Sequence, residues 1–455
     1  MRKAFLTNLT IISVLACVCR AEFRVNTHTT WDQKDAAIAI DANGNFIVVW
    51  NSYRQDGDSG GIFGQRFSST GQPAGSEFQI NTITAGNQAR PAAAMDAAGN
   101  FVVAWQGPGV SDEDVFAQRF AADGQPLGLE FQVNSYAHSQ QLYAGIAGSA
   151  GGQFVAVWQS KKTPQDANRT SICGQLYDSA GWMIGPEFTI SEAPANCRYP
   201  AAAMDDSGNF AVVWMEEDGS NKIMVRLYNA DGTVRTEPLQ VNTVRFSSIT
   251  QPSIAMASSG RFAITWDGDP NRASDDDIHA RLYQPDGTPM SEQFVVNTTR
   301  RSSQQNPRVA MNNWREFVIV WESRVDPNVN ERDIFGQRYD SAGLPIGGEF
   351  QVNTFAAGDQ RNAAAAMDRA GRFVTVWQSD GQDGSGYGIF AEMGSLVDSA
   401  NLNSDGSVDF YDFCILASQW QQQGNSLSAD LLVDDRIDHC DLAAFCRQWL
   451  TAQVQ

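Results

Sequence analysis

The sequence predicts a mainly β fold: a seven-bladed, four-stranded β-propeller closed by its own N-terminal strand, followed by a small α-helical domain. Three observations predict it. One strand pattern recurs seven times between residues 23 and 393, it begins partway through its own period, and it changes after Gly394. The 455 residues carry 32 Lys+Arg against 52 Asp+Glu. This acid excess argues against binding to nucleic acid or to an anionic membrane surface, because both select basic patches.

Residues 1–21 are predicted to be a signal peptide. A basic start precedes an interrupted apolar run, and Cys19 and Ala21 provide the small residues that suit cleavage after Ala21. The run is too short to predict a transmembrane span, and no other stretch could form one. We therefore expect the chain to be secreted or at the cell surface. A lipoprotein is the less favoured alternative, because residues 14–17 resemble a lipoprotein box only weakly.

Each repeat contains four short strands. Its clearest mark is a second strand such as FIVVW, preceded by an apolar run and a tight turn, and followed by runs such as IFGQRF and FQINT. Asn-Gly and Ala-Gly supply the positive φ that a hairpin turn needs. Four strands joined by turns make one antiparallel sheet, so seven repeats predict a β-propeller over residues 22–394. The second strands end at Trp50, Trp105, Trp158, Trp214, Trp266, Trp321 and Trp377.

The two ends of the repeated region complement each other. FRVNT at residues 23–27 matches a fourth strand but precedes the first complete repeat, and the last repeat stops after its third strand at residues 389–393. We predict that these two segments pair in one sheet. Such pairing would close the ring and remove two exposed sheet edges.

The repeated Trp side chains are predicted to fill the space between neighbouring sheets, with a carbohydrate-stacking ring as the alternative. Nearly all variation in repeat length falls in the loop between the second and third strands. These seven loops hold 20 Asp+Glu against 8 Lys+Arg. Variable loops on a fixed scaffold often bind ligands, so this acidic face is a candidate site for cations or a cationic partner. Charge that keeps the loops soluble is the favoured alternative.

Five cysteines remain after the predicted cleavage. Cys173 and Cys197 are expected to form the one disulfide of the propeller, because the chain is exported and the two residues lie on neighbouring blades. Cys414 and Cys446 are a weaker candidate pair across the C-terminal helices.

Residues 401–451, after a linker at 395–400, contain a loop-helix unit that is repeated after 29 residues. Oxygen-bearing side chains at positions 1, 3, 5 and 12 of a twelve-residue loop suit calcium, which takes six to eight oxygen ligands. The second loop has Leu432 at position 3 and Asp435 in place of the bend Gly, so weaker binding is expected there. The predicted calcium ligands are Asn401, Asn403, Asp405, Ser407, Asp409 and Asp412 in the first loop, and Asp430, Asp434, Asp438 and Asp441 in the second.

The motifs NLNSDGSVDFYDF and ADLLVDDRIDHCDL resemble a dockerin domain over about 50 residues. The resemblance implies calcium binding and docking to a cohesin module, often in proteins that degrade polysaccharides. Asn401 stands where dockerins usually have Asp, and residues 410–411 and 439–440 are not the usual small polar pairs that contact cohesin. The resemblance therefore supports calcium binding better than it supports a particular partner. The expected partner is a cohesin-like or cell-surface protein.

Two functions remain open. The favoured hypothesis is a non-catalytic protein whose propeller binds a polysaccharide or another extracellular ligand while the C-terminal module docks. The alternative is a polysaccharide hydrolase or lyase with its site on the acidic loop face. The sequence identifies no catalytic residue, because its 52 Asp+Glu could place a pair of carboxylates anywhere on the propeller. The four His occupy unrelated positions, which disfavours a His-centred base. The repeat symmetry is broken modestly at residues 215–217, 267–270 and 313–316.

Overall fold

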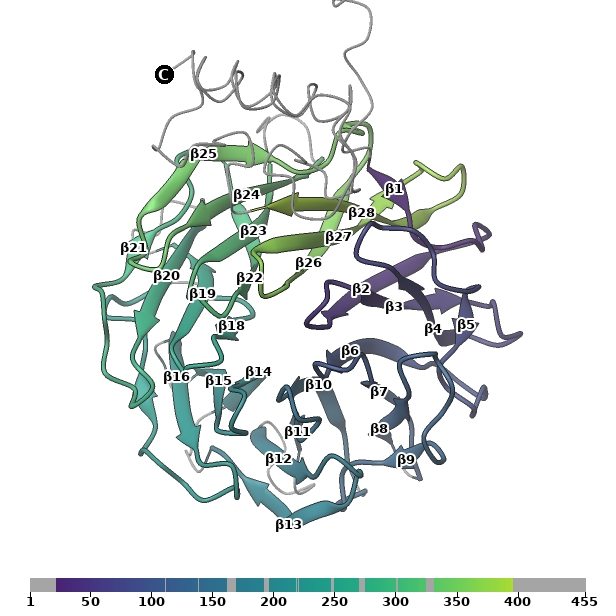
Figure 1. Ribbon diagram of the computed structural model, residues 1–455, viewed down its shortest axis with the longest axis horizontal. Coiled ribbons are helices and arrows are strands. Elements are labelled where there is room, and N and C mark those ends of the chain that lie inside the picture. The colour runs from purple at the N-terminus through teal and green to yellow at the C-terminus, as the bar shows by residue number, and fades with distance from the viewer. Residues whose placement is uncertain are drawn as a thin grey trace, which may run out of the picture. The chain divides into compact units, whose positions relative to one another are not determined.

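A computed structural model describes residues 22–110, 112–137, 139–161, 169–191, 196–217, 219, 221–246, 249–269, 275–299, 302–324 and 331–395. Their 28 strands form seven four-stranded antiparallel sheets within one compact unit, Glu22–Leu396. The sheets are arranged as blades around a central axis, which confirms the seven-bladed β-propeller (Figure 1). Among these residues, no helix is long and apolar enough to cross a membrane.

The blades are numbered from the first inner strand. Blade 1 contains β2 (Gln33–Ile40), β3 (Phe46–Tyr53), β4 (Gly60–Phe67) and β5 (Phe78–Gln79). Blade 2 contains β6 (Ala89–Met95), β7 (Phe101–Pro108), β8 (Glu113–Phe120) and β9 (Phe131–Gln132). Blade 3 contains β10 (Gln141–Gly148), β11 (Phe154–Ser160), β12 (Ser171–Tyr177) and β13 (Met183–Thr189). Blade 4 contains β14 (Asn196–Met204), β15 (Phe210–Glu217), β16 (Asn221–Tyr228) and β17 (Leu239–Gln240).

Blade 5 contains β18 (Ser253–Met256), β19 (Phe262–Gly268), β20 (Asp277–Tyr283) and β21 (Phe294–Val295). Blade 6 contains β22 (Gln304–Met311), β23 (Phe317–Ser323), β24 (Asp333–Tyr339) and β25 (Pro345–Gln351). Blade 7 contains β26 (Gln360–Met367), β27 (Arg372–Asp380), β28 (Tyr387–Ser395) and, from the other end of the chain, β1 (Phe23–Arg24).

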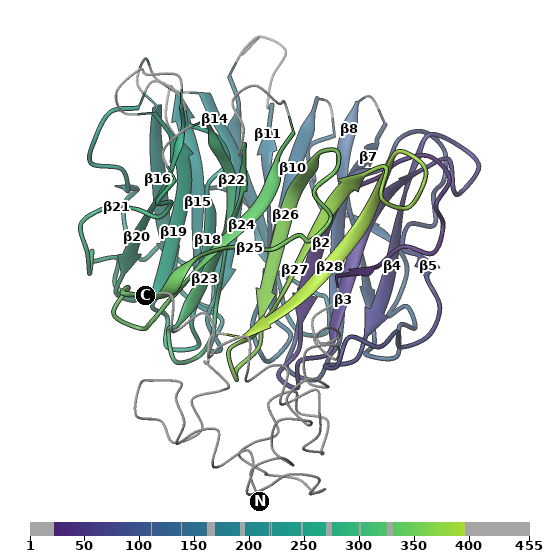
Figure 2. The same cartoon turned by 90° about the horizontal axis from the view of Figure 1, so that it is seen from above.

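The second strand of each blade is buried on both faces. Neighbouring sheets stack against both of its sides, as the side-on view in Figure 2 shows, so these strands read as continuous apolar runs instead of alternating patterns. The seven repeated Trp side chains are at most 1% exposed. They pack between blades, which confirms the packing interpretation and excludes a sugar-stacking role for them.

The N-terminal strand closes the ring as predicted. Phe23 pairs with Ala391 and Arg24 with Phe390, so blade 7 has the order β1-β28-β27-β26. The backbone N–H of Val25 also donates to the carbonyl of Ile389 at 2.8 Å. Blade 7 therefore takes strands from both ends of the propeller.

A hydrogen-bonded clasp joins successive blades. At the closing junction, the backbone N–H and the hydroxyl of Thr354 donate to the Glu22 carboxylate at 2.7 and 2.9 Å. The same clasp links a Thr or Ser after one fourth strand to a Glu or Gln directly before the Phe of the next fourth strand. Its other members are Thr27–Glu77, Thr82–Glu130, Ser135–Glu187, Thr243–Gln293 and Thr298–Glu349.

The predicted disulfide is wrong. Cys173 and Cys197 are both buried and are not bonded to each other. Cys173 on β12 packs with Trp158 in the core between blades 2 and 3, whereas Cys197 on β14 packs with Trp214 between blades 3 and 4. The two thiols thus lie on opposite sides of the blade 3 sheet.

Several predictions lie outside the described residues. They are the signal peptide at 1–21, the candidate pair Cys414–Cys446, and the dockerin-like module at 401–451 with all its calcium ligands.

Candidate functional site

Seven inner strands surround the central axis (Figure 1), and all of them contribute residues to one cavity there, which we call the channel. They are β2, β6, β10, β14, β18, β22 and β26. Six of them carry a bulge at the same register, where the sheet pairing skips two residues. Each bulge holds a non-glycine residue with left-handed φ of 51° to 55°, and Gln251 takes the corresponding place in blade 5. We call these seven residues the mouth ring: Asp35, Arg90, Tyr143, Tyr199, Gln251, Asn306 and Asn362.

The bulges carry a conformational cost. A left-handed residue that is not Gly costs roughly 1–2 kcal/mol, and bulges typically re-aim a side chain. Neighbouring blades hold three of the bulges through the residue that follows the buried Trp. Gln378 accepts from the N–H of Asp35 at 3.2 Å, Gln106 from that of Tyr143 at 3.2 Å, and Glu322 from that of Asn362 at 2.8 Å. Each of these three mouth-ring positions is therefore fixed by the preceding blade.

A cavity of about 560 Å³ opens within the mouth ring. It lies toward the face of the loops between second and third strands, because the bulges are near the start of the inner strands, where Gln33 pairs with Ser52 at the end of β3. The acidic loops of the sequence indicated this face as a candidate ligand site. The lining comes from the inner strands, however, and not from the acidic loops.

The floor of the cavity is open because the next inward-facing position is small in six blades. Arg308 occupies that position in blade 6 and enters the space. Its Nη2 donates to Oε1 of Gln251 at 3.1 Å, and its Nη1 donates to the carbonyl of Pro307 at 2.9 Å. The small residues are Ala37, Ala92, Gly145, Ala201, Ser253 and Ala364.

Three consecutive blades place an acid, a cation and a phenol side by side. The Arg90 guanidinium lies 4.1 Å from the centroid of the Tyr143 ring, and the Tyr143 and Tyr199 rings meet edge to face at 4.8 Å. Burial raises the pKa of Tyr143 against the opposing effect of Arg90. Burial also raises the pKa of Asp35, which accepts from Nδ2 of Asn362 at 3.0 Å.

Two buried acids lie behind the mouth ring. Asp267 and Glu322 follow the Trp in blades 5 and 6, where the other blades have Asn, Gln or Met. The Glu322 side chain accepts from Nδ2 of Asn306 at 2.9 Å and pairs with Arg332 at 3.1 Å. Burial raises the pKa of Asp267 to about 6. Burial also lowers the pKa of Arg308, and the charges of Glu322 and Asp267 oppose this shift.

The departures from the repeat seen in the sequence have different meanings. Asp267 adjoins the candidate site. Residues 313–316 instead form the turn between β22 and β23, at the opposite end of the blade.

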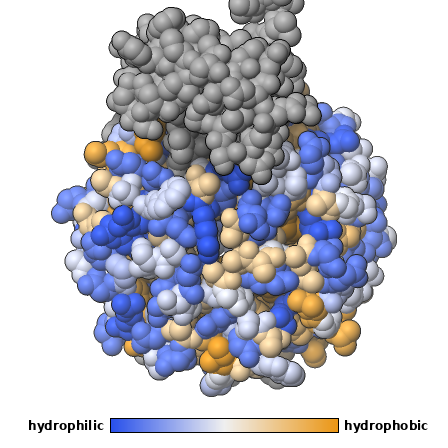
Figure 3. Space-filling model, in the orientation of Figure 1, coloured by the Kyte–Doolittle hydropathy of each residue, from blue (hydrophilic) through white to orange (hydrophobic). Residues whose placement is uncertain are grey.

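Hydrophilic residues dominate the face of the propeller in Figure 3, and strongly hydrophobic residues are scattered on it.

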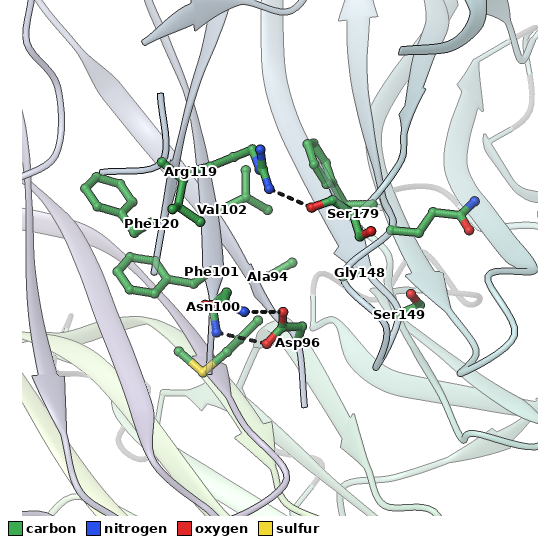
Figure 4. A pocket seen from close by; sticks show the side chains of 15 residues that line it. Ala94, Asp96, Asn100, Phe101, Val102, Arg119, Phe120, Gly148, Ser149 and Ser179 are labelled. Atoms are coloured by element: carbon green, nitrogen blue, oxygen red, sulfur yellow. Dashed lines mark hydrogen bonds between the residues drawn. The ribbon is translucent and has the colours of Figure 1, made fainter. Parts of the chain in front are cut away.

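A smaller pocket of about 140 Å³ lies between blades 2 and 3 (Figure 4). Its polar groups are used by the fold. The Asp96 carboxylate accepts from the side chain of Asn100 at 2.8 Å and caps their shared turn, and Nη2 of Arg119 donates to the carbonyl of Ser179 at 2.6 Å. This pocket is therefore an interblade joint, and the channel mouth is the better candidate site.

None of the mouth-ring residues was identified from the sequence. A signal was present: five of the seven repeats share Gln-x-x at the start of the inner strand, and the third position changes from Asp35 to Arg90, Tyr143, Asn306 and Asn362. Within the described parts of the chain, no group of three or more His, Cys, Asp or Glu is placed to hold a metal ion.

Comparisons with known proteins bear on the fold alone. No family model matches the chain, and no curated protein matches it in sequence. Among solved structures, it is similar to a PL25 ulvan lyase bound to -[GlcA(1-4)Rha3S]-, with 11% identity, a TM-score of 0.51 and coverage of 83% of this chain and 95% of the other. It is also similar to polysaccharide lyase Uly1, with 10% identity, a TM-score of 0.51 and coverage of 86% and 95%.

Proposed function

We propose that this protein cleaves an acidic polysaccharide by β-elimination, with its active site in the mouth ring. The observation that carries the proposal is the Asp35–Arg90–Tyr143 arrangement in the 560 Å³ cavity. The similarity to two propeller polysaccharide lyases supports it. The proposal replaces the binding platform favoured by the sequence with the catalytic alternative.

The charges of the cavity suit a uronate. Arg90 and Arg308 enter it from blades 2 and 6, on different sides of the channel, and a guanidinium binds a carboxylate through parallel hydrogen bonds. Arg90 takes the carboxylate of the sugar that reacts. Neutralising this carboxylate acidifies the C5 proton next to it, because the charge that develops on removal of the proton spreads onto the carboxyl oxygens.

The two flanking residues then divide the proton transfers. Asp35 removes the C5 proton, and its raised pKa makes it a stronger base than an ordinary carboxylate. The electron pair of the C5–H bond forms a C4=C5 double bond, and the C4–O4 bond breaks. Tyr143 donates its phenolic proton, which a tyrosine carries at neutral pH, to the leaving O4. Tyr199 orients the Tyr143 ring through their edge-to-face contact.

The test is a panel of polysaccharides incubated with the protein: ulvan, alginate, polygalacturonate and, as a neutral control, arabinan. Elimination gives both new reducing ends and the ultraviolet absorbance of an unsaturated uronate, whereas hydrolysis gives reducing ends alone. We expect both signals from at least one acidic polymer. Reducing ends alone would favour hydrolysis, for which Asp35 with its raised pKa is also suited. No product from any polymer would refute a cleaving function.

Variants locate the site. Asp35→Asn and Tyr143→Phe are each expected to lower kcat by at least about 100-fold, the usual contribution of a proton-transfer group. Arg90→Gln is expected to lower kcat by about 100-fold as well, because it removes the charge that stabilises the developing anion. Tyr177→Phe is the matched control, because Tyr177 is a buried phenol packed between blades 2 and 3. It should leave kcat unchanged. Full activity of Tyr143→Phe would contradict the assignment of the leaving-group acid.

We also propose, from the sequence, that the protein is secreted and that residues 401–451 bind calcium and dock to a cohesin-like or cell-surface partner. The duplicated loop motif supports calcium binding at Asn401, Asn403, Asp405 and Asp412. Such docking would hold the propeller near an insoluble polysaccharide. Pull-down of calcium-loaded and chelated protein with cohesin modules tests the partner.

A further inference from the structure

Blade 1 carries an exposed aromatic cluster. The Trp31 side chain is 52% exposed and Tyr53 is 37% exposed, although both are large and apolar. Their rings meet edge to face at 6.3 Å. The Arg54 guanidinium lies over both rings, 5.7 Å from the centroid of Trp31 and 5.1 Å from that of Tyr53. We call Trp31, Tyr53 and Arg54 the blade 1 platform.

The backbone holds this platform in an unfavourable conformation. Trp31 and Arg54 have φ of 65° and 61°, in the left-handed region that bulky side chains avoid. Blade 7 has Gly358 and Gly381 at the two equivalent positions, with φ of 71° and 72°. Glycine adopts this left-handed backbone without strain at both positions, whereas blade 1 has Trp and Arg there. Strain of this kind persists where the surrounding structure fixes it, and it points to function.

Local hydrogen bonds fix the platform. The N–H of Tyr53 donates to the carbonyl of Asp32 at 2.9 Å, and Nε2 of Gln33 donates to the carbonyl of Trp31 at 3.3 Å. The N–H of Arg54 donates to the carbonyl of Ser59 at 2.7 Å, as Gly381 does to Gly386 in blade 7. The side chain of Arg54 has no hydrogen-bond or ion-pair partner among the described residues, so its donors are available to a ligand.

The platform lies on the same face as the mouth ring. Trp31 precedes β2, and Tyr53 ends β3, at the end of the blade where the cavity opens. Trp31 is four residues before Asp35, a distance of at most about 13 Å along an extended chain. A chain molecule that occupies the cavity can thus continue across the platform.

We propose that the blade 1 platform is a second sugar-binding subsite, which takes an acidic sugar residue of the polysaccharide outside the cavity. Trp31 stacks on the face of the sugar ring, and Arg54 binds its carboxylate or sulfate group. This inference rests on the proposed function for the identity of the polymer. It adds that the protein prefers long acidic chains to short ones.

The test measures binding of acidic oligosaccharides of increasing length by calorimetry, with the full chain carrying Tyr143→Phe to prevent cleavage. Trp31→Gly removes the ring and places the residue of blades 2 and 7 at this position, so folding should be preserved. We expect about a tenfold loss of affinity for long oligosaccharides, the scale of one aromatic stacking contact, and no change for those that fill only the cavity. Trp31→Phe should recover most of the affinity, and Arg54→Gln should lose affinity for acidic chains only.

Trp314→Ala is the matched control, because Trp314 is 58% exposed in the turn between β22 and β23 at the opposite end of the blades. It should bind all lengths as the parent does. Equal affinity of Trp31→Gly and its parent for long chains would overturn the subsite, even if the Tyr143 test of cleavage succeeds. A protein that cleaves nothing but binds long acidic chains through Trp31 would keep the subsite and refute the lyase.

Discussion

Replacing Asp267 by Asn separates the charge of this buried residue from its shape. The Asp267 side chain is fully buried behind the mouth ring, and its carboxylate accepts a hydrogen bond from the Thr250 hydroxyl. Asn keeps a carbonyl oxygen for this bond and cannot ionise. The variant therefore removes the cost of a buried negative charge, which Asp276 nearby increases.

The pH dependence of this cost has a definite sign. Burial raises the pKa of Asp267 from 3.8 to about 6, so the folded protein binds this proton more tightly than the unfolded chain. The resulting stability is fully present below pH 3.8 and is lost as the pH rises through about 6. At 1.36 kcal/mol per pKa unit the whole loss is about 3 kcal/mol. About 1.4 kcal/mol of it develops between pH 5 and pH 8.

Guanidinium unfolding of wild type and Asp267→Asn at pH 5, 6, 7 and 8 measures this loss of stability. All four pH values lie above the isoelectric point of about 4.5. The free energy of unfolding of the variant should rise by about 1.4 kcal/mol relative to that of wild type between pH 5 and pH 8. An unpaired amide N–H would shift all four differences equally and leave the trend intact. Asp286→Asn controls for the lost charge, because hydrogen bonds from Thr288 lower the pKa of Asp286 and its difference should be flat above pH 5. A flat difference for Asp267→Asn would refute the argument.

Three further predictions concern stability and metal binding. Glu322→Ala should lower the free energy of unfolding by about 3–5 kcal/mol in guanidinium, because it leaves Arg332 as a charge without its buried partner. Gln378→Ala, which removes a neutral side chain from the equivalent position, should lower it by about 1–2 kcal/mol. Equal losses in the two variants would contradict the role of the Glu322–Arg332 pair. Deletion of residues 22–27 should lower the melting temperature, and a peptide of that sequence should partly restore it; an unchanged melting temperature would contradict closure by β1. In calcium titrations of the full chain, Asp405→Ala should weaken binding more than Asp434→Ala, since the second loop lacks a ligand and the bend Gly; no heat of binding would contradict the calcium loops.

The sequence predicted the fold because its signals are local and repeated. A strand that ends in Trp, a glycine turn and an unmatched FRVNT segment define a blade and its closing partner without any knowledge of distant contacts. The disulfide prediction failed because sequence position placed Cys173 and Cys197 on neighbouring blades, and it could not show that they face different cores.

The mouth ring escaped detection for a related reason. In a regular strand, side chains alternate between the two faces of the sheet, so Asp35 and Arg90 would have belonged to the surface between blades. The bulge turns these side chains toward the channel. Its left-handed residue is Asp, Arg, Tyr or Asn, whereas a glycine at this position would have indicated the bulge in the sequence.

The composite blade 7 also sets the order in which the chain can be completed. A ribosome makes β1 first, yet its partner β28 ends at Ser395, so β1 must wait unpaired while six blades are synthesised. A stalled or truncated chain keeps blade 7 open, with an unpaired edge on β1 and incomplete packing beside blades 1 and 6. Only a chain that includes β28 can pair β1 and close the ring. A chain that ends before β28 exposes a strand edge that other chains or proteases can reach.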